Sequence, residues 1–287
     1  MNNIVLLGNG HAAIESFRNI IKSFNVTGVI IPYKDEIIEK LCLENSIEYS
    51  YNIIDLEKFN PDICLMISYG ILIPNELIMK YNFINVHYGL LPKYRGMHTV
   101  AWAIINGEKE VGYTIHKVDK QIDNGDILRQ EKIKVHLKDN IDIIMKKLDN
   151  LLENKICEFL KDYINGEVDI VKQDINKATF FCKRNLIDCR INWNDSTYNI
   201  LNFIRALTPP YPGAYTRYKE EEIIIISAEE FNNERYIEIP GHVLYIIEDV
   251  GFIVKTGDTT ILVKEIMVNK KIMPADKYFN TVGARLL

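Results

Sequence analysis

Short apolar runs alternate with helical stretches in the first part of the chain, and this alternation constrains the fold more than any other feature. The runs IVLL, VTGVII and ICLMIS occupy residues 4–7, 26–31 and 63–68. Runs this short and continuous are typical of parallel strands that are buried on both faces. Between them, residues 12–24 and 35–45 carry apolar side chains at helical spacing. This order predicts a Rossmann-like α/β fold with an open, mostly parallel sheet.

The pattern extends the sheet beyond these strands. The sequence NFINVH at residues 82–87 predicts a fourth strand, and a short helix over 99–105 follows it after a loop. Residues 111–118 and 127–135 resemble a strand pair that is joined by the turn-forming sequence IDNGD. Residues 140–165 have a helical period, and we expect this long helix to cross the back of the sheet.

A different pattern begins near residue 200. The sequence TPPYPG contains three prolines and a glycine, which break regular structure. Turn residues separate the apolar runs that follow it, at 223–227, 242–247, 251–256 and 260–268. Short strands with this spacing are typical of a small β-barrel. We therefore expect a Rossmann-like domain over residues 1–200 and a smaller, β-barrel-like domain over 201–287.

The composition argues against several classes of protein. The net charge of −5 gives no overall positive field that would attract nucleic acid or anionic lipid. The five cysteines lack C-x-x-C spacing, so we expect reduced thiols and no metal site. No apolar run approaches the roughly 18 residues of a spanning helix, and the N-terminus lacks the basic region of a signal peptide. We therefore expect a cytoplasmic protein without a membrane partner.

A glycine-containing turn, GNGH at residues 8–11, follows the first strand. Ala13 replaces the third glycine of a dinucleotide-binding loop, and Asp35 or Glu36 lies near the acidic position of that motif. A tight turn between a strand and a helix needs glycine for backbone reasons alone, which is the simpler interpretation. Alternatively, the helix N-terminus binds a phosphate or sugar of a substrate, and Gly10 and His11 are then candidate substrate-binding residues.

The most informative segment runs from Asn85 to Gly96. In a strand, the period of two places Asn85 and His87 on one face, at the carboxyl end where open α/β sheets bind ligands. An amide and an imidazole suit the stabilisation of an oxyanion during acyl transfer. No serine or cysteine lies beside the histidine in a nucleophile-elbow context, so covalent catalysis is disfavoured.

A carboxylate is needed to set the charge of the histidine or to take a proton. The turn between the paired strands contains Asp123, which would reach the imidazole directly or through a water molecule. The sequence alone does not select Asp123 over Asp119 or Asp126. Asp123 is also compatible with a purely structural role in an Asx turn.

Together these segments resemble the folate-dependent formyltransferases. That family includes methionyl-tRNA formyltransferase, glycinamide ribonucleotide transformylase and the sugar-nucleotide N-formyltransferases. The resemblance rests on residues 68–74, 84–108 and 111–128, and extends more weakly through residues 205–216 to cover nearly the whole chain. It implies direct transfer of a formyl group from N10-formyltetrahydrofolate to an amine, without a metal ion.

The resemblance also implies a role for individual residues. The catalytic asparagine, histidine and aspartate of the family fall on Asn85, His87 and Asp123, and the carboxylate is expected to keep the imidazole protonated. Gly89 replaces a frequent serine of the family, and we expect little effect on the chemistry. The folate-binding residues implied are Tyr69, Gly70, Ile71, Leu72, Ile73, Leu90, Leu91, Pro92, Asp119, Gln121 and Ile122. The acceptor-binding residues implied in the following loop are Lys93, Tyr94, Arg95, Gly96 and His98.

The resemblance leaves the acceptor open. Residues 87–107 look closer to the sugar-nucleotide branch, which favours a nucleotide-linked amino sugar. A tRNA-binding enzyme is expected to carry a basic segment near residues 34–45, which are net acidic here, so nucleic acid is disfavoured. Methionyl-tRNA is the second candidate, and a folate- or nucleotide-binding module without catalysis is a remote third. An exposed apolar strip on the second domain would allow a homodimer.

Overall fold

The computed structural model describes residues 2–231, 235–279 and 281–287. Contacts divide the chain into two compact units. The first consists of residues 1–99, 110–134 and 145–181, and the second of residues 100–109, 135–144 and 182–287. The boundary expected after residue 200 stays a prediction and falls inside helix α6 (Thr197–Leu207).

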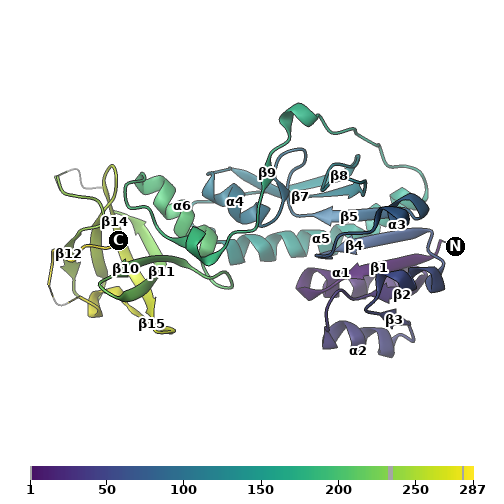
Figure 1. The fold of residues 1–287 in the computed structure, drawn as a ribbon, viewed down its shortest axis with the longest axis horizontal. Helices are drawn as coiled ribbons and strands as arrows, with labels where there is room; N and C mark the ends of the chain where they lie inside the picture. The colour runs from purple at the N-terminus through teal and green to yellow at the C-terminus, as the bar shows by residue number, and fades with distance from the viewer. Residues whose placement is uncertain (1, 232–234, 280) are drawn as a thin grey trace. The chain divides into compact units, whose positions relative to one another are not determined.

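The first unit is built on a seven-stranded sheet with the order β3-β2-β1-β4-β5-β7-β8 (Figure 1). Strands β3, β2, β1, β4 and β5 are parallel, whereas β7 and β8 are antiparallel to their neighbours. The predicted Rossmann-like, mostly parallel sheet is therefore confirmed. The strands are β1 (Ile4–Gly8), β2 (Val26–Ile30), β3 (Tyr49–Ser50), β4 (Ile63–Ile67), β5 (Phe83–His87), β7 (Glu110–Lys117) and β8 (Ile127–Lys134).

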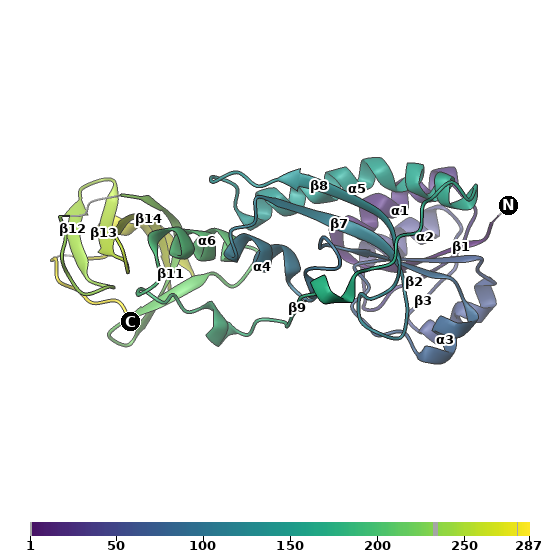
Figure 2. The same ribbon diagram turned by 90° about the horizontal axis from the view of Figure 1, so that it is seen from above.

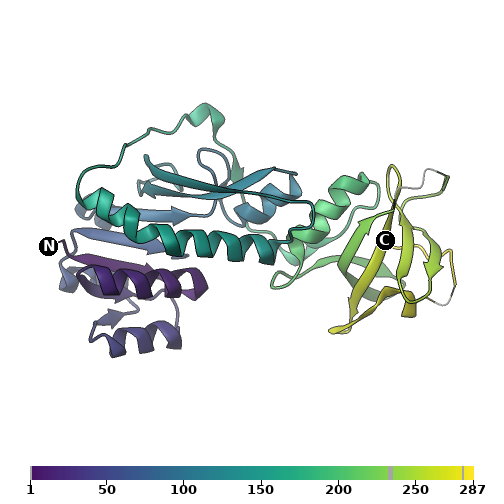
Figure 3. The ribbon, with the colours of Figure 1, turned by 180° about the vertical axis from the view of Figure 1, so that it is seen from behind.

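Both faces of this sheet are buried, as the continuous apolar runs require. On β1, Ile4 and Leu6 belong to one core cluster, while Val5 and Leu7 belong to another on the opposite face. Helices α1 (Gly10–Ser23), α2 (Glu36–Glu44) and α5 (Ile141–Ile164) contribute to the first cluster (Figure 3). The 3₁₀ helix over Ile53–Phe59 contributes to the second, and α3 (Asn75–Lys80) packs against it.

The second unit contains a separate antiparallel sheet with its own core (Figure 2). Helix α6 buries Ile200 and Ile204 in that core, together with Ile223 and Ile225 of β11. The prediction of a β-rich second domain is therefore confirmed. The strands are β10 (Ala214–Tyr218), β11 (Glu221–Glu230), β12 (Val243–Ile247), β13 (Gly251–Lys255), β14 (Thr260–Val268) and β15 (Lys271–Pro274).

Two short strands near the end of β5 were not predicted. Strand β6 (Arg95–Gly96) pairs in parallel with β9 (Phe180–Phe181), so a distant segment of the chain lies against the loop that follows β5. Helix α4 (Thr99–Ile105), which was predicted, begins directly after this loop. Pairs of two residues leave no periodic signal in a sequence, which explains why β6 and β9 were missed.

No helix among the described residues is long and apolar enough to cross a membrane.

Helix α2 offers a matched test of the core. Leu41 is 5% exposed and Leu43 is 71% exposed, although both are leucines of one helix. We expect Leu41→Ala to lower the free energy of unfolding by about 2–5 kcal/mol and Leu43→Ala to change it by less than about 0.5 kcal/mol. Urea denaturation measures both values. Equal effects of the two substitutions would contradict the packing of α2 described above.

Candidate active site

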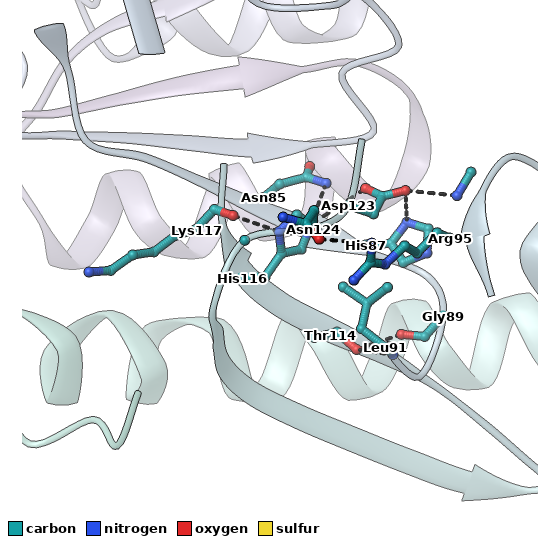
Figure 4. Close-up of polar contacts among 12 residues, drawn as sticks. Asn85, His87, Gly89, Leu91, Arg95, Thr114, His116, Lys117, Asp123 and Asn124 are labelled. Carbon is teal, nitrogen blue, oxygen red and sulfur yellow. Dashed lines mark hydrogen bonds and ion pairs between the residues drawn. The ribbon is translucent and has the colours of Figure 1, made fainter. Parts of the chain in front are cut away.

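Strands β5 and β7 bring several polar side chains together (Figure 4). The two strands pair with Asn85 opposite His116 and His87 opposite Thr114. Because side chains alternate along each strand, these four lie on one face. His87 and His116 are 8% and 2% exposed, and their rings lie 6.3 Å apart. The site is thus a largely buried polar cluster on β5 and β7, with His87 at the carboxyl end of β5.

Asp123 lies between the two imidazoles. Its Oδ2 is 3.5 Å from Nδ1 of His87, and its Oδ1 is 3.5 Å from Nε2 of His116. The backbone N–H of Gly96 also donates to Oδ2, at 2.8 Å. Of the three carboxylates that the sequence left open, this one contacts the imidazoles. Asp119 instead accepts from the side chain of Asn124 within the same turn, at 2.7 Å.

Opposing effects set the charge of these groups. Burial alone would raise the pKa of Asp123, but contacts with His116, His87 and the N–H of Gly96 outweigh it, and the pKa lies below its usual value. Burial lowers the pKa of His87, although Asp123 and the carbonyl of Tyr94 oppose this shift. The site therefore combines an ionised carboxylate with an uncharged imidazole near neutral pH. This differs from our expectation that Asp123 keeps His87 protonated, because burial has the larger effect.

The loop after β5 covers His87. Its Nε2 donates to the backbone oxygen of Tyr94 at 2.6 Å, and Tyr94 has a positive φ of 56°. A Cβ atom on Gly89 would lie 2.6 Å from this nitrogen and 2.7 Å from the same oxygen. A side chain at this position would therefore displace either the imidazole or the loop, whereas the expectation that the absent serine hydroxyl has little effect on the chemistry stays a prediction.

Arg95 does not face an acceptor, which corrects the sequence-based assignment. The residue is 1% exposed, and its guanidinium is directed into the protein. Nη1 donates to Oδ1 of Asn124 at 2.9 Å, while Nε and Nη2 donate to Oε1 of Gln173 at 3.2 and 2.6 Å. Arg95 therefore supports the turn that contains Asp123. An arginine in a loop can extend either into solvent or into the protein, and the residue type alone does not show which of the two occurs.

Gln173 completes this support from a distant segment. Its Nε2 donates to the backbone oxygens of Asp123 and Gly125, at 2.9 and 2.7 Å. Gly125 permits the close approach of the turn to β7, because a Cβ atom there would lie 1.8 Å from the oxygen of Lys117. We refer to Arg95, Asn124 and Gln173 as the turn clamp. Asp123 has a positive φ of 51°, and the clamp holds the turn in this conformation.

Sequence reasoning missed His116 and Gln173. The signal for His116 was present, since the predicted strand pair places an imidazole next to the strand with Asn85 and His87. Gln173 had no such signal, because it lies in an irregular segment about 50 residues from the turn that it contacts.

The residues expected to bind the folate differ in exposure. Tyr69 and Ile73 are buried in the sheet core, and Leu91 is buried with its backbone bonded to Thr114 and Gln130. Other members of the set are exposed apolar side chains, which suit contact with a flat heterocycle. These are Ile71 (38%), Leu72 (76%) and Ile122 (55%). Gly70 and Gln121 are also exposed, whereas Leu90 and Pro92 are half-buried.

The glycine turn at residues 8–11 is occupied by protein groups. The N–H of Gly10 donates to Oδ2 of Asp35 at 3.0 Å, and Nδ1 of His11 lies 3.2 Å from Oδ2 of Asp149. The acidic residue noted in the sequence thus occupies a position where an anionic ligand would bind. In the loop after β5, Lys93 is exposed and His98 and Gly96 are half-buried. Among the described residues, no group of three His, Cys, Asp or Glu side chains is arranged to hold a metal ion.

Comparison with known proteins identifies relatives along nearly the whole chain. The family profile "Formyl transferase" matches residues 27–160, and "Formyl transferase, C-terminal domain" matches residues 185–283. The methionyl-tRNA formyltransferase of Malacoplasma penetrans is 32% identical over 93% of this chain and 89% of its own length. That of Clostridium novyi is 32% identical over 96% and 95%.

Solved structures share the fold at lower identity. A sugar 3N-formyltransferase, WlaRD, solved with dTDP and 5-N-formyl-THF, has a TM-score of 0.72 and 21% identity, and covers 94% of this chain and 99% of its own. HypX of Aquifex aeolicus in complex with tetrahydrofolic acid has a TM-score of 0.67 and 19% identity, over 98% of this chain and 47% of its own. The methionyl-tRNA formyltransferase of Clostridium thermocellum has a TM-score of 0.59 and 20% identity, over 80% and 94%.

The sequence relatives contradict one expectation. Net charge and the acidic segment at residues 34–45 led us to regard nucleic acid as an unlikely partner, and the resemblance of residues 87–107 to the sugar-nucleotide branch made a nucleotide-linked amino sugar the main candidate. The curated relatives are named methionyl-tRNA formyltransferases, so the judgement against nucleic acid is wrong. Net charge is a sum over the chain, whereas phosphate binding depends on local surface charge.

The charge of Asp123 can be tested through His87. Because the carboxylate favours the protonated imidazole, Asp123→Asn should lower the pKa of His87 further. Asp126→Asn is the matched control, since it removes a carboxylate from the same turn that is not among the groups acting on His87. Histidine NMR titrations measure both. A similar shift in the two variants would refute the assigned contact.

The turn clamp can be tested through stability. Gln173→Ala leaves N–H groups of a buried guanidinium and two oxygens of the turn without their partner, and we expect it to cost about 1–3 kcal/mol of unfolding free energy. Lys172→Ala, at the exposed neighbouring position, should change stability by less than about 0.5 kcal/mol. Denaturant unfolding measures both, and equal stability of the variants would show that the clamp contributes nothing.

Proposed function

The chain belongs to the formyl transferase family, and we propose that its acceptor is the amino group of methionyl-tRNA. It is a folate-dependent N-formyltransferase, and N10-formyltetrahydrofolate is its formyl donor. The observation that supports the acceptor is the similarity to methionyl-tRNA formyltransferases at 32% identity over more than nine-tenths of the chain. The sugar formyltransferase WlaRD matches at only 21% identity, which supports the shared fold alone.

The residues present fit the donor. Exposed apolar side chains of Ile71, Leu72 and Ile122 lie on the two loops assigned to it, and these loops also offer backbone groups. An apolar surface with a few polar groups suits a flat ring with hydrogen-bonding edges. When bound, the donor supplies a formyl carbon that is open to attack by an amine. We assign the other parts of the reaction to Asn85, His87 and Asp123. These parts are orientation of the reactants, stabilisation of charge and proton transfer.

Asn85 is the residue that we assign to the developing charge on the formyl oxygen. Its Nδ2 carries two N–H groups, and the contact with His116 uses one of them. His87 is less suited in this arrangement, because its Nε2 is bonded to Tyr94 and its Nδ1 faces Asp123. The second N–H of Asn85 thus provides a fixed donor for an oxyanion that forms only during the reaction.

His87 and Asp123 form the base of the proposed reaction. The acceptor amine must lose a proton as its bond to the formyl carbon forms, and the leaving nitrogen of the donor must gain one when its bond to that carbon breaks. Nε2 of the uncharged imidazole already carries a proton for Tyr94, so Nδ1 accepts the first proton, beside the ionised carboxylate, and returns it in the second step. Burial of the pair strengthens this coupling, because solvent screening is weak there.

The acceptor is tested by offering the purified protein N10-formyltetrahydrofolate with methionyl-tRNA and, in parallel, with a nucleotide-linked amino sugar. Mass spectrometry of the products identifies the amine that gains a formyl group. We expect formylated methionyl-tRNA and an unmodified sugar nucleotide. A formylated sugar beside unmodified tRNA would overturn the proposal.

The catalytic assignment is tested in the same assay. Asn85→Ala should reduce kcat by about 10²- to 10³-fold, which is the typical loss when one oxyanion donor is removed. Asn165→Ala makes the same change at an exposed position after α5 and should leave kcat unchanged. Circular dichroism checks that both variants fold. A folded Asn85→Ala variant with a normal kcat would show that another group stabilises the oxyanion.

A further inference from the structure

We propose that His116 is a positioning residue, which fixes the orientation of the Asn85 carboxamide so that an N–H group, and not the carbonyl oxygen, faces the formyl group. The inference rests on the proposed reaction and adds a residue to it. It starts from the register of β5 and β7, in which Asn85 and His116 are directly opposite each other. Figure 4 shows the imidazole of His116 between the carboxamide of Asn85 and the backbone of Lys117.

The backbone determines which ring nitrogen of His116 carries a proton. Nδ1 lies 2.8 Å from the oxygen of Lys117, and a carbonyl oxygen only accepts hydrogen bonds. Nδ1 is therefore protonated. In the tautomer with its proton on Nδ1 alone, Nε2 presents a lone pair and acts as an acceptor. The 2% exposure of His116 excludes a competing bond to bulk water.

The carboxamide of Asn85 supplies the matching donor. Its Nδ2 lies 3.2 Å from Nε2 of His116, which is within hydrogen-bonding range. The other neighbour of Nε2 is Oδ1 of Asp123, at 3.5 Å. A carboxylate oxygen cannot donate to a lone pair, so in this tautomer the hydrogen bond of Nε2 is the shorter contact to Asn85, and the carboxylate would be its partner only if Nε2 carried a proton.

This hydrogen bond decides which way the amide is turned. The nitrogen and oxygen of a carboxamide are nearly equal in size, and a flip exchanges a donor for an acceptor. A flipped Asn85 would direct its oxygen at the lone pair of Nε2, which is repulsive. His116 therefore selects one of the two orientations before a substrate binds. Such preorganisation lowers the cost of stabilising charge in the transition state.

The proposal is tested by two substitutions with opposite expectations. His116→Met removes the acceptor but keeps a side chain of similar bulk, so the amide loses its fixed orientation. We expect kcat to fall about 10- to 100-fold, while the KM values for donor and acceptor change little. His116→Gln places an amide oxygen near the position of Nε2 and should restore most of kcat. The exposed His136→Met variant is the control and should keep wild-type activity.

A double-mutant cycle separates this role from a general effect on the site. If His116 acts through Asn85, then His116→Met should have little further effect on kcat in an Asn85→Ala background. Additive losses would overturn the proposal, since they would mean that His116 acts independently of the carboxamide. Failure of His116→Gln to recover activity would overturn it as well.

A measurement without turnover keeps this test distinct from the acceptor assignment. In ¹⁵N NMR of the protein without substrates, His116 should show a protonated Nδ1 and an unprotonated Nε2, and Asn85→Ala should shift the Nε2 resonance. A protonated Nε2 in the uncharged ring would refute the proposal. If an amine other than methionyl-tRNA is formylated, the kinetic cycle is carried out with that amine, and only the acceptor assignment fails.

Discussion

The antiparallel pairing of β5 with β7 is the constraint on which the active site depends. Strands β1, β4 and β5 pair in parallel, but a parallel neighbour of β5 would not have placed a residue directly opposite Asn85 as His116 is. The reversal brings two polar residues of each strand onto one face. It also returns the chain through a short turn, so the carboxylate of Asp123 reaches the same face. One change of strand direction therefore assembles the cluster.

Holding that turn requires a second, unrelated contact. Asp123 has a left-handed backbone conformation, which is unfavourable for residues other than glycine. The turn clamp offsets this cost through hydrogen bonds from Gln173 and from the buried guanidinium of Arg95. Burying the charge of an arginine costs desolvation free energy. The clamp therefore stabilises the turn only if all of its hydrogen bonds to the guanidinium are formed. The carboxylate is thus positioned by a segment that carries no catalytic group.

The sequence predicted the parts of the structure that follow from periodicity and missed those that depend on single distant contacts. Continuous apolar runs predicted the sheet, and alternation along β5 predicted that Asn85 and His87 share a face. No periodic signal marked Gln173, and the residue type of Arg95 suggested a ligand contact although the side chain is buried. The acidic segment of α2 misled the choice of partner, because charge counted along a sequence does not show which surface meets a phosphate. Family resemblance, not periodicity, singled out Asp123 among three aspartates.

Because Gly89 has no side chain, the imidazole of His87 lies where a methyl group at position 89 would not fit. The loop oxygen of Tyr94 and Nε2 of His87 share that space. Any residue larger than glycine there would force the ring and the loop apart, and so would free a nitrogen that the loop now holds. The residue type at position 89 therefore determines how readily His87 gives up its hydrogen bond to Tyr94 for a contact with a substrate.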